Sequence, residues 1–493
     1  MRGPTRGSYL HPPVATEVKL DPYARHWRLA RGALAHLAGG STRAHRDWTI
    51  EIGPDLPCLE LRLPDNAGCI WLLGHPWVPD GTVAAFIEEL PRPASREQWL
   101  IRLDQLRGSW CAIVVTDRES FVMLDAAGSL PAFFDPGARA LASCVALIAT
   151  QPALEAADDT LGQRRRSSES YLPFGLTAWP TVAHLLPDHA LDLESFHPFR
   201  HWPFRWPSPT SDLDATVDEI VSELRLAMAV ACRDGRPLMG LTGGRDSRVL
   251  LACARDLVGN IDFFTWAHAD DGARRDLADA AALAELAGVR HRDQAVIAPD
   301  AAFDEYWALS TSGALSDRRA KAAAASSVSL GSQRAMILGT GAEVGRAYYW
   351  QSGDQHLPHL ELDDLIERLG VPATAVVAEA GQQWLSSLPV VDVEAALDLA
   401  YIEQRLGCWA SAWASGSGVG PRYLFPYVGR RLFELYLALP AEFRRQDALA
   451  AEIIRRTWPD LLRLPFNRPA SWRRRVSAAL ARTPVLWRFA RRL

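Results

Sequence analysis

The residues of this sequence that are best suited to chemistry lie in one short loop, Leu241–Ser247 (LTGGRDS). Two glycines let a backbone turn tightly, so that consecutive N–H groups can point into one anion-binding concavity. Thr242 supplies a hydroxyl group, and Asp246 supplies a carboxylate of the kind that holds Mg²⁺. No lysine follows the glycines, so the loop is neither a Walker loop nor a GxGxxG motif. The loop predicts a phosphate cradle, and the alternative is a plain strand-to-helix turn capped by Asp246 or Ser247.

The segments around this loop alternate between strand and helix. Apolar runs at 237–241, 261–267 and 335–339 predict buried strands, and the patterns at 248–256 and 276–288 predict helices. Strands that alternate with helices indicate a parallel, doubly wound sheet covered on both faces. In such a sheet the loop lies between a strand and the N-terminus of a helix, whose dipole favours an anion.

The rest of the chain differs before and after this region. The first ~200 residues favour short β strands, with a hairpin predicted from runs at 112–115 and 121–124. A proline-rich stretch at 197–212 predicts a linker. An amphipathic helix follows it, with apolar residues spaced by three and four from Leu213, and the chain beyond ~355 favours helices. The predicted domains are residues 1–205 and 212–465, followed by a basic tail at 466–493.

Composition excludes several classes of protein. The net charge of −5 over 493 residues argues against a dedicated nucleic-acid binder, so no nucleic acid is expected as a partner. Seven scattered cysteines without a CxxC pair predict neither a zinc site nor a disulfide framework. No apolar run is long enough for a membrane span, and the start lacks the apolar core of a signal peptide. We therefore expect a cytoplasmic protein.

Several segments together resemble the asparagine synthetase family. PLMGLTGGRDSRVLLA is similar to the pyrophosphate loop of that family, with Thr242 in place of serine and Arg245 at a variable position. ILGTGAEVG resembles a later family loop, and YLFPYVGRRLFELYLALP resembles a segment near the end of the catalytic domain. Upstream, LRGSWCAIVVTD and HLLPDHALDL resemble the glutaminase domain. The resemblance extends along nearly the whole chain.

This resemblance implies a fold and a reaction. The fold is an N-terminal, degenerate glutaminase-like αββα domain of the N-terminal-nucleophile type, then a doubly wound parallel-sheet ATP-pyrophosphatase domain with a helical C-terminal part. The reaction uses ATP and Mg²⁺ to convert a carboxylate into an acyl-adenylate with release of pyrophosphate. An amine then displaces AMP and leaves an amide.

The resemblance also implies roles for individual residues. Asp246 and Glu343 would hold magnesium, although Glu343 replaces an aspartate of the family. An acid on a surface loop is the alternative for Glu343. The other nucleotide contacts implied by the family pattern are Leu241, Thr242, Gly243, Gly244, Ser247, Trp266, Leu338, Gly339 and Gly341.

A catalytic pair is suggested by the segment that begins at Tyr401. Glu403 lies near the edge of an apolar helical stripe, where burial would raise the pKa of its carboxyl and suit it to act as a general base on an amine. β-Lactam synthetase, a relative, uses a Tyr–Glu dyad of this kind, so Tyr401 and Glu403 are the candidates. A salt bridge between Glu403 and Arg405 is the equally ordinary alternative.

Two features of the family are missing. Its glutaminase requires a cysteine directly after the initiator methionine, whereas this chain has Arg2 there and no cysteine before Cys58. The family also places a lysine after the last helices, and the only lysines here are Lys19 and Lys321. Arginines can replace a lysine electrostatically, because they are always charged. The candidates are Arg455, Arg456 and Arg468, with solvated helix arginines as the alternative for each.

Relatives without the glutaminase cysteine include β-lactam synthetase and the lasso-peptide cyclases, which join an amine and a carboxylate of one substrate. We therefore expect an amide ligase that hydrolyses no glutamine, with a lasso-peptide-type macrolactam cyclase favoured. Its partners would be a precursor peptide and its processing proteins. A small-molecule ligase that uses ammonia or an internal amine is a close alternative. A non-catalytic nucleotide-binding scaffold is the alternative from another class.

Overall fold

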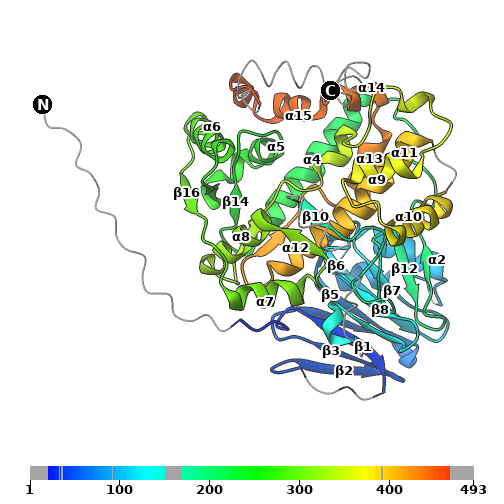
Figure 1. Cartoon of the computed structure of the whole chain (residues 1–493). Helices are drawn as coiled ribbons and strands as arrows, with labels where there is room; N and C mark the ends of the chain where they lie inside the picture. Colours follow the sequence, from blue (N-terminus) through cyan, green and yellow to red (C-terminus); the bar gives the residue numbers. More distant parts are fainter. Residues whose placement is uncertain are drawn as a thin grey trace, which may run out of the picture.

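The computed structural model describes residues 20–466 except 33, 35, 36, 92, 150–168, 390 and 391. The chain forms a mixed α/β structure in which antiparallel sheets occupy one end and a parallel sheet with its helices the other (Figure 1). The basic tail that the sequence predicts at 466–493, Arg468 included, lies outside the described residues apart from Phe466. Within the described ranges, no helix is both long enough and apolar enough to cross a bilayer.

Two antiparallel sheets make up the first part of the described chain. The predicted hairpin is confirmed, because β6 and β7 pair antiparallel with Ile113 opposite Val122. In spatial order, one sheet contains β11 (Ala183–His184), β8 (Phe133–Asp135), β9 (Ala140–Ala142), β1 (Trp27–Arg31), β3 (Trp48–Ile52) and β2 (Ser41–His45). The other contains β13 (Pro198–Arg200), β12 (His189–Asp192), β7 (Ser120–Leu124), β6 (Arg107–Thr116), β5 (Gly68–Trp77) and β4 (Cys58–Arg62).

Alternation along these strands sends side chains to both sides of each sheet. Trp27 and Ile50 of one sheet share a core with Trp71 and Ile113 of the other, so the two sheets pack face to face. The outer face of the second sheet is covered by α1 (Val83–Glu88) and α2 (Arg96–Asp104). Among the described residues, the 3₁₀ turn Val145–Leu147 and loop residues such as Trp179 and Val182 pack against the opposite outer face. The described residues thus show the two sheets and one helical layer of the expected αββα arrangement.

The predicted parallel sheet is confirmed, with β14 at its centre. Its side chains alternate between two cores: Leu238 and Phe264 pack with Trp413, whereas Met239 and Phe263 pack with residues of α4 and α5. Both faces are therefore covered, as a doubly wound sheet requires. The strands in spatial order are β16 (His291–Ala295), β15 (Asp262–Ala267), β14 (Leu238–Gly240), β18 (Ala335–Ile337) and β19 (Arg422–Leu424).

The helices form largely where hydrophobic spacing predicts them. The long helix α4 (Leu213–Ala231) buries Val217, Ile220, Leu224 and Met228 on one face. The helices α5 (Asp246–Cys253) and α6 (Asp271–Ala287) begin two and five residues before their predicted starts. The remaining ones are α7 (Ala301–Ser310), α8 (Arg318–Ser327), α9 (Leu362–Leu369), α10 (Ala375–Ser387), α11 (Val393–Ala400), α12 (Ser411–Gly416), α13 (Arg430–Ala438), α14 (Ala441–Arg445) and α15 (Leu449–Thr457).

One helical segment departs from ordinary geometry. Residues Tyr401–Ala410, between α11 and α12, form a π-helix, in which each turn holds more residues than in an α-helix. The hydrophobic spacing of three and four still places Ile402 and Leu406 in the core. π-Helical turns are often found at functional sites.

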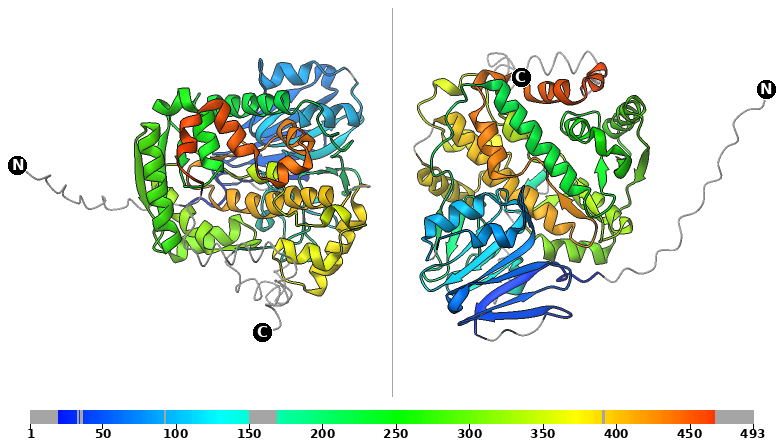
Figure 2. Two further views of the ribbon diagram at one scale, coloured as in Figure 1. Left: turned by 90° about the horizontal axis from the view of Figure 1, so that it is seen from above. Right: turned by 180° about the vertical axis from the view of Figure 1, so that it is seen from behind.

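The two parts of the chain are in extensive contact (Figure 2). The first sheet pair ends at β13, and the proline-rich segment then leads to α4, which begins at Leu213. A strand from the first part, β10 (Glu169–Tyr171), pairs antiparallel with β17 (Leu315–Asp317) from the second. A two-stranded sheet therefore crosses the boundary that the sequence places between the domains.

Candidate functional site

The loop 241–247 connects β14 to α5, as the sequence predicts. The hydroxyl oxygens of Thr242 and Ser247 lie 3.0 Å apart, and the Ser247 hydroxyl also accepts the Thr242 N–H at 3.1 Å. Gly244 N–H donates to the Thr242 hydroxyl at 3.2 Å. The two hydroxyls that the sequence assigns to phosphate binding therefore bond to each other and to the backbone of the same loop.

Glycines are needed here for close approach rather than for a left-handed backbone. A Cβ atom on Gly243 would lie 2.7 Å from Cβ of Asp279 in α6, and one on Gly339 would lie 2.9 Å from Cβ of Asp246. Gly341 is different, because its φ of 101° is one that glycine adopts most easily. These close approaches explain why Gly243 and Gly339 leave no room for a side chain.

The loop meets a second turn, residues 338–346, that follows β18. Chain order moves from β14 to β15 and β16 on one side, while β18 lies on the other side of β14. The carboxyl ends of β14 and β18 are therefore the point at which the strand order reverses, which is where open parallel sheets bind ligands. Asp246 from the first loop and Glu343 from the second come together there, as the sequence predicts for these two carboxylates.

An arginine that the sequence analysis did not single out lies between these carboxylates. Nη2 of Arg346 is 3.2 Å from Oδ2 of Asp246 and 3.0 Å from Oε1 of Glu343. Oε2 of Glu343 accepts the Gly341 N–H at 3.2 Å. Burial and the charge of Glu343 raise the pKa of Asp246 to about 7, while Arg346 acts in the opposite direction.

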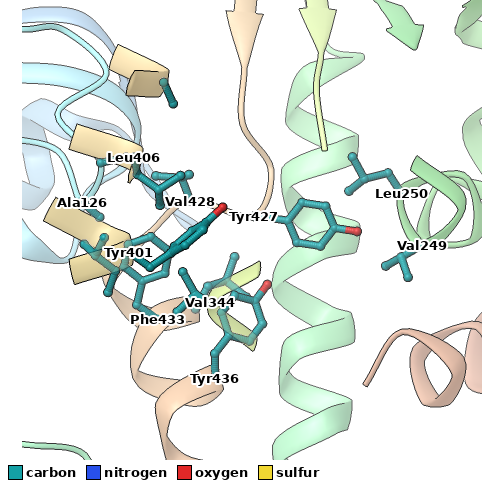
Figure 3. Packing of buried hydrophobic residues seen from close by; sticks show 14 of the residues in the cluster. Ala126, Val249, Leu250, Val344, Tyr401, Leu406, Tyr427, Val428, Phe433 and Tyr436 are labelled. Atoms are coloured by element: carbon teal, nitrogen blue, oxygen red, sulfur yellow. The ribbon is translucent and has the colours of Figure 1, made fainter. Parts of the chain in front are cut away.

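Four tyrosines complete this side of the site. Tyr427 donates its hydroxyl hydrogen to the backbone carbonyl of Asp246 at 2.7 Å, and its ring points toward α5 (Figure 3). The Tyr401 side chain lies beside Glu343, and burial together with that carboxylate raises the pKa of Tyr401 well above its ordinary value. The Tyr401 ring also packs against Tyr348 and Tyr349, at centroid distances of 5.4 and 5.6 Å.

Glu403 does not face this cluster. Its fully buried carboxylate is held by the guanidinium of Arg200 and by Nε1–H of Trp384 at 2.7 Å. Burial opposes the charged form, but Arg200 and His189 outweigh it, so the pKa of Glu403 lies below its usual range. The raised pKa expected from sequence is therefore wrong, and a general base of lowered pKa is a weaker one.

The geometry of a helix separates the predicted dyad. Residues two positions apart on a helix point in different directions, so Tyr401 reaches Glu343 while Glu403 reaches the antiparallel sheets through Arg200. The catalytic role of Glu403 stays a prediction that its surroundings do not favour. The acidic residue that contacts Tyr401 is Glu343.

Acidic residues also lie on the far side of the loop. The carboxylate of Asp276 in α6 lies beside the Gly243 N–H, and burial together with neighbouring Asp279 raises the pKa of Asp276. A phosphate bound at this N–H has to displace that carboxylate. The spacing of Asp276 and Asp279 on one helix face was visible in the sequence, but nothing there indicated contact with the loop.

Two arginines, Arg248 and Arg245, connect the loop to other segments of the chain. The buried guanidinium of Arg248 donates to the carbonyls of Gly243 at 3.1 Å and Pro465 at 3.1 Å, which ties the loop to the end of the described chain. Arg245 pairs with Asp447 at 2.9 Å. By contrast, Arg455 and Arg456 pair with Glu452 on their own helix, and Arg456 also reaches α4.

The backbone positions predicted to bind the nucleotide lie at the carboxyl edge of the sheet. Trp266 lies near the end of β15. Its ring packs edge-on against the Phe264 ring, with the two ring centroids 5.0 Å apart. The Leu338 N–H already donates to the carbonyl of Leu424 at 3.0 Å. The structure therefore places these residues at the predicted edge.

Two large cavities lie elsewhere. They measure about 580 and 530 Å³ and lie between the antiparallel sheets and the amino-terminal side of β19, sharing His75 and Arg422. None of the residues that the sequence predicts for nucleotide binding or catalysis lines either cavity. The chemistry-bearing residues gather instead at the switch point of the parallel sheet.

A protein-held magnesium ion does not fit the arrangement at Asp246 and Glu343. Mg²⁺ requires six oxygen ligands at 2.0–2.1 Å in octahedral geometry, commonly including one or two carboxylates. Here the two carboxylates are already paired with Arg346. Within the described part of the chain, no group of three or more His, Cys, Asp or Glu side chains is arranged to hold a metal ion.

Comparison with known proteins adds little to this geometry. No family model matches the chain, and no curated protein is significantly similar to it. Among solved structures, glutamine phosphoribosylpyrophosphate amidotransferase from B. subtilis, complexed with ADP and GMP, is 14% identical, with 66% of this chain and 72% of that chain covered and a TM-score of 0.22. A structure described as the allosteric regulatory enzyme of purine biosynthesis is also 14% identical, with 64% and 69% covered and a TM-score of 0.23. At these values the likeness carries no argument about fold or activity.

Proposed function

We propose that this chain is an ATP-dependent ligase that forms an amide bond by adenylating a carboxylate. The observation that carries the proposal is the meeting of loop 241–247 with turn 338–346 at the switch point of a parallel sheet. A strand, a glycine-containing loop and a helix N-terminus together favour binding of phosphate groups. The resemblance of the LTGGRDS sequence to a pyrophosphate loop selects ATP among phosphate-bearing ligands.

In the first half-reaction, a substrate carboxylate oxygen attacks the α-phosphorus of ATP and pyrophosphate leaves. The N-terminus of α5 and the hydroxyls of Thr242 and Ser247 lie where they can bind the departing phosphates. Arg346 adds a positive charge that is present at every physiological pH. Tyr427 fixes the backbone at Asp246 through its hydrogen bond to the carbonyl.

In the second half-reaction, an amine nitrogen attacks the acyl carbon, AMP leaves, and the amine gives up a proton. The aromatic cluster of Tyr348, Tyr349 and Tyr401 beside Glu343 supports this assignment, because aromatic faces and a carboxylate both attract an ammonium group. The Tyr348 side chain is 53% exposed, so a substrate can reach it. Glu343, which lies beside Tyr401, is a carboxylate at this surface that can accept the proton.

The substrate class rests on sequence. The resemblance to ligases that hydrolyse no glutamine favours an amine that comes from the substrate itself or from free ammonia. We favour a peptide that carries both the carboxylate and the amine, as in a lasso-peptide-type macrolactam cyclase. A small molecule with both groups is the alternative within the same reaction.

The test is pyrophosphate release from ATP by the full chain, over a panel of carboxylate-bearing small molecules and precursor peptides. Asp246→Asn keeps the shape of the side chain but removes its charge, and exposed Asp460→Asn is the matched control. We expect release with the wild type and with Asp460→Asn but not with Asp246→Asn. The productive panel member then distinguishes a peptide from a small-molecule substrate. Absence of any nucleotide binding would sink the proposal.

One observation favours a second function, a nucleotide-binding scaffold without catalysis. The carboxylate of Asp276 lies beside the Gly243 N–H, where a phosphate would bind. A scaffold binds ATP but releases no pyrophosphate with any panel member. Replacing Asp276 with asparagine then strengthens ATP binding without creating turnover.

A further inference from the structure

We infer that Arg346 is the fixed cation of this site and takes the place of a protein-held magnesium ion between Asp246 and Glu343. This inference deepens the proposed function and rests on it for the identity of the ligand. It departs from what the family resemblance implies for these two carboxylates. Any divalent ion then reaches the site on the phosphates of the nucleotide, not on the protein.

The first argument is occupancy of the carboxylate oxygens. A single nitrogen, Nη2 of Arg346, contacts one oxygen of Asp246 at 3.2 Å and one of Glu343 at 3.0 Å. The second oxygen of Glu343 accepts the Gly341 N–H, and the Tyr401 side chain lies beside this carboxylate. A metal ion between the carboxylates has to expel the guanidinium, because both cations need the same oxygens.

The second argument is that the backbone holds Arg346 in place. Arg346 ends the 3₁₀ turn Ala342–Arg346, and the next residue, Ala347, has the left-handed φ of 53°, which is costly for a residue other than glycine. The Val344 carbonyl accepts a hydrogen bond at 2.7 Å from Arg444, which is itself paired with buried Asp398. Because this turn is fixed on both sides, the Arg346 side chain leaves the backbone from one defined position.

The third argument is chemical. A guanidinium carries its charge at every physiological pH and offers several N–H donors in one plane, which suits phosphate oxygens. Its side chain here is 22% exposed, so one side of it is open to a ligand. Nε of Arg346 is buried without a hydrogen-bond partner, so a phosphate has to approach the guanidinium from its exposed side. Arg346 can therefore neutralise the two carboxylates and still bind a phosphate.

The test measures binding of Mn²⁺ alone to the full chain without nucleotide, by electron paramagnetic resonance of the free ion. The wild type is compared with Arg346→Gln, with Arg346→Gln combined with Glu343→Gln, and with the exposed ion-pair control Arg319→Gln. We expect millimolar or weaker binding by the wild type and the control. Arg346→Gln should bind at least tenfold more tightly, and adding Glu343→Gln should remove that gain.

Two results overturn the inference: Mn²⁺ binding by the wild type that Glu343→Gln abolishes, or unchanged Mn²⁺ affinity in Arg346→Gln. The wild-type comparison decides the matter even if Arg346→Gln fails to fold. As a second measurement, binding of ATP in excess EDTA should fall at least tenfold in Arg346→Gln, and unchanged binding contradicts the inference. A chain that fits both measurements but never releases pyrophosphate loses the ligase proposal alone.

Discussion

Arg430 and Arg346 each lie between two carboxylates, in two regions that differ in every other respect. Nε of Arg430 bonds to Asp104 at 2.9 Å and Nη1 to Asp188 at 2.6 Å, and its guanidinium packs over the Trp202 ring. These groups come from both parts of the chain and are almost entirely buried. Arg346, by contrast, is open on one side and keeps an unpartnered Nε.

The difference teaches how to distinguish a structural ion cluster from a functional one. Around Arg430 the third donor, Nη2, is also used, by the Pro187 carbonyl at 3.0 Å, and nearby Glu403 is held by Arg200 in the same interface. A buried network of this kind holds the two parts together, and removing one member leaves buried charge unpaired. At Arg346 one side of the guanidinium is exposed, so a bound ligand can supply the remaining contacts.

The largest effect we expect comes from Arg430→Met. Loss of the guanidinium leaves Asp104 and Asp188 buried without their cation, which should lower the free energy of unfolding by about 3–5 kcal/mol. Urea unfolding measures this change. The next residue, Arg431, makes only exposed ion pairs, so Arg431→Met should cost less than about 1 kcal/mol. Equal losses in the two variants contradict a structural role special to Arg430.

Glu403→Gln should cost about 2 kcal/mol, because hydrogen bonds to a buried charged group contribute about 1.5–3 kcal/mol. If Glu403 is structural, the pH profile of pyrophosphate release stays as in the wild type. Glu343→Gln should change that profile instead. A profile that shifts with Glu403→Gln at unchanged stability restores Glu403 as the base.

Acid should weaken the antiparallel sheets. Burial lowers the pKa of His184 to about 4, from an ordinary 6.5 in the unfolded chain. The folded state therefore resists protonation, and its stability is complete above pH 6.5 and falls as the pH drops from 6.5 toward 4. Between pH 7 and 5 this one group should cost about 2 kcal/mol of unfolding free energy.

The measurement is urea unfolding at both pH values. His184→Gln should lose that part of the pH dependence, and the exposed control His197→Gln should keep it. A pH dependence that survives in His184→Gln assigns it to other groups.

The smallest effect we expect is at the cluster of Arg346, Asp246 and Glu343. Gly339→Ala places a Cβ atom 2.9 Å from Cβ of Asp246, so the two loops must separate slightly. Binding of a fluorescent ATP analogue should weaken about tenfold, since small misplacements at a positioned site are costly. Gly259→Ala meets no atom within 4 Å and serves as the control. Unchanged affinity in Gly339→Ala would mean that this contact does not shape the site.

Much of the fold was predictable because it follows from local patterns. The stripe Val217, Ile220, Leu224 and Met228 predicts α4, and it is buried along its length. Three apolar runs predict β14, β15 and β18, and their alternation with helices predicts the parallel sheet. The earlier start of α6 reflects a cap, because it begins after Asp270, whose carboxylate accepts the Ala273 N–H. The residue before α5, Arg245, makes no side-chain capping hydrogen bond. The π-helix at 401–410 has no signal in hydrophobic spacing, since it keeps the same residues inward.

The candidate site was predictable only in part. Asp246 and Glu343 follow strands that lie side by side, so their proximity follows from the order of the sheet. Arg346, Tyr427 and Asp276 escaped notice, because each reaches the loop from a distant segment by a particular side-chain direction. Helical spacing could have warned that Tyr401 and Glu403 face different neighbours.

The sequence by itself determined the elements and the location of the chemistry, because strand, loop and helix signals are local and the strand order brings their ends together. Only the tertiary structure decided what each charge does. Glu403 became part of a buried interface once Arg200 was folded against it, and Asp246 gained an arginine as its partner from a hundred residues away. Long-range ion pairs depend on how whole elements pack, and no local spacing contains that information.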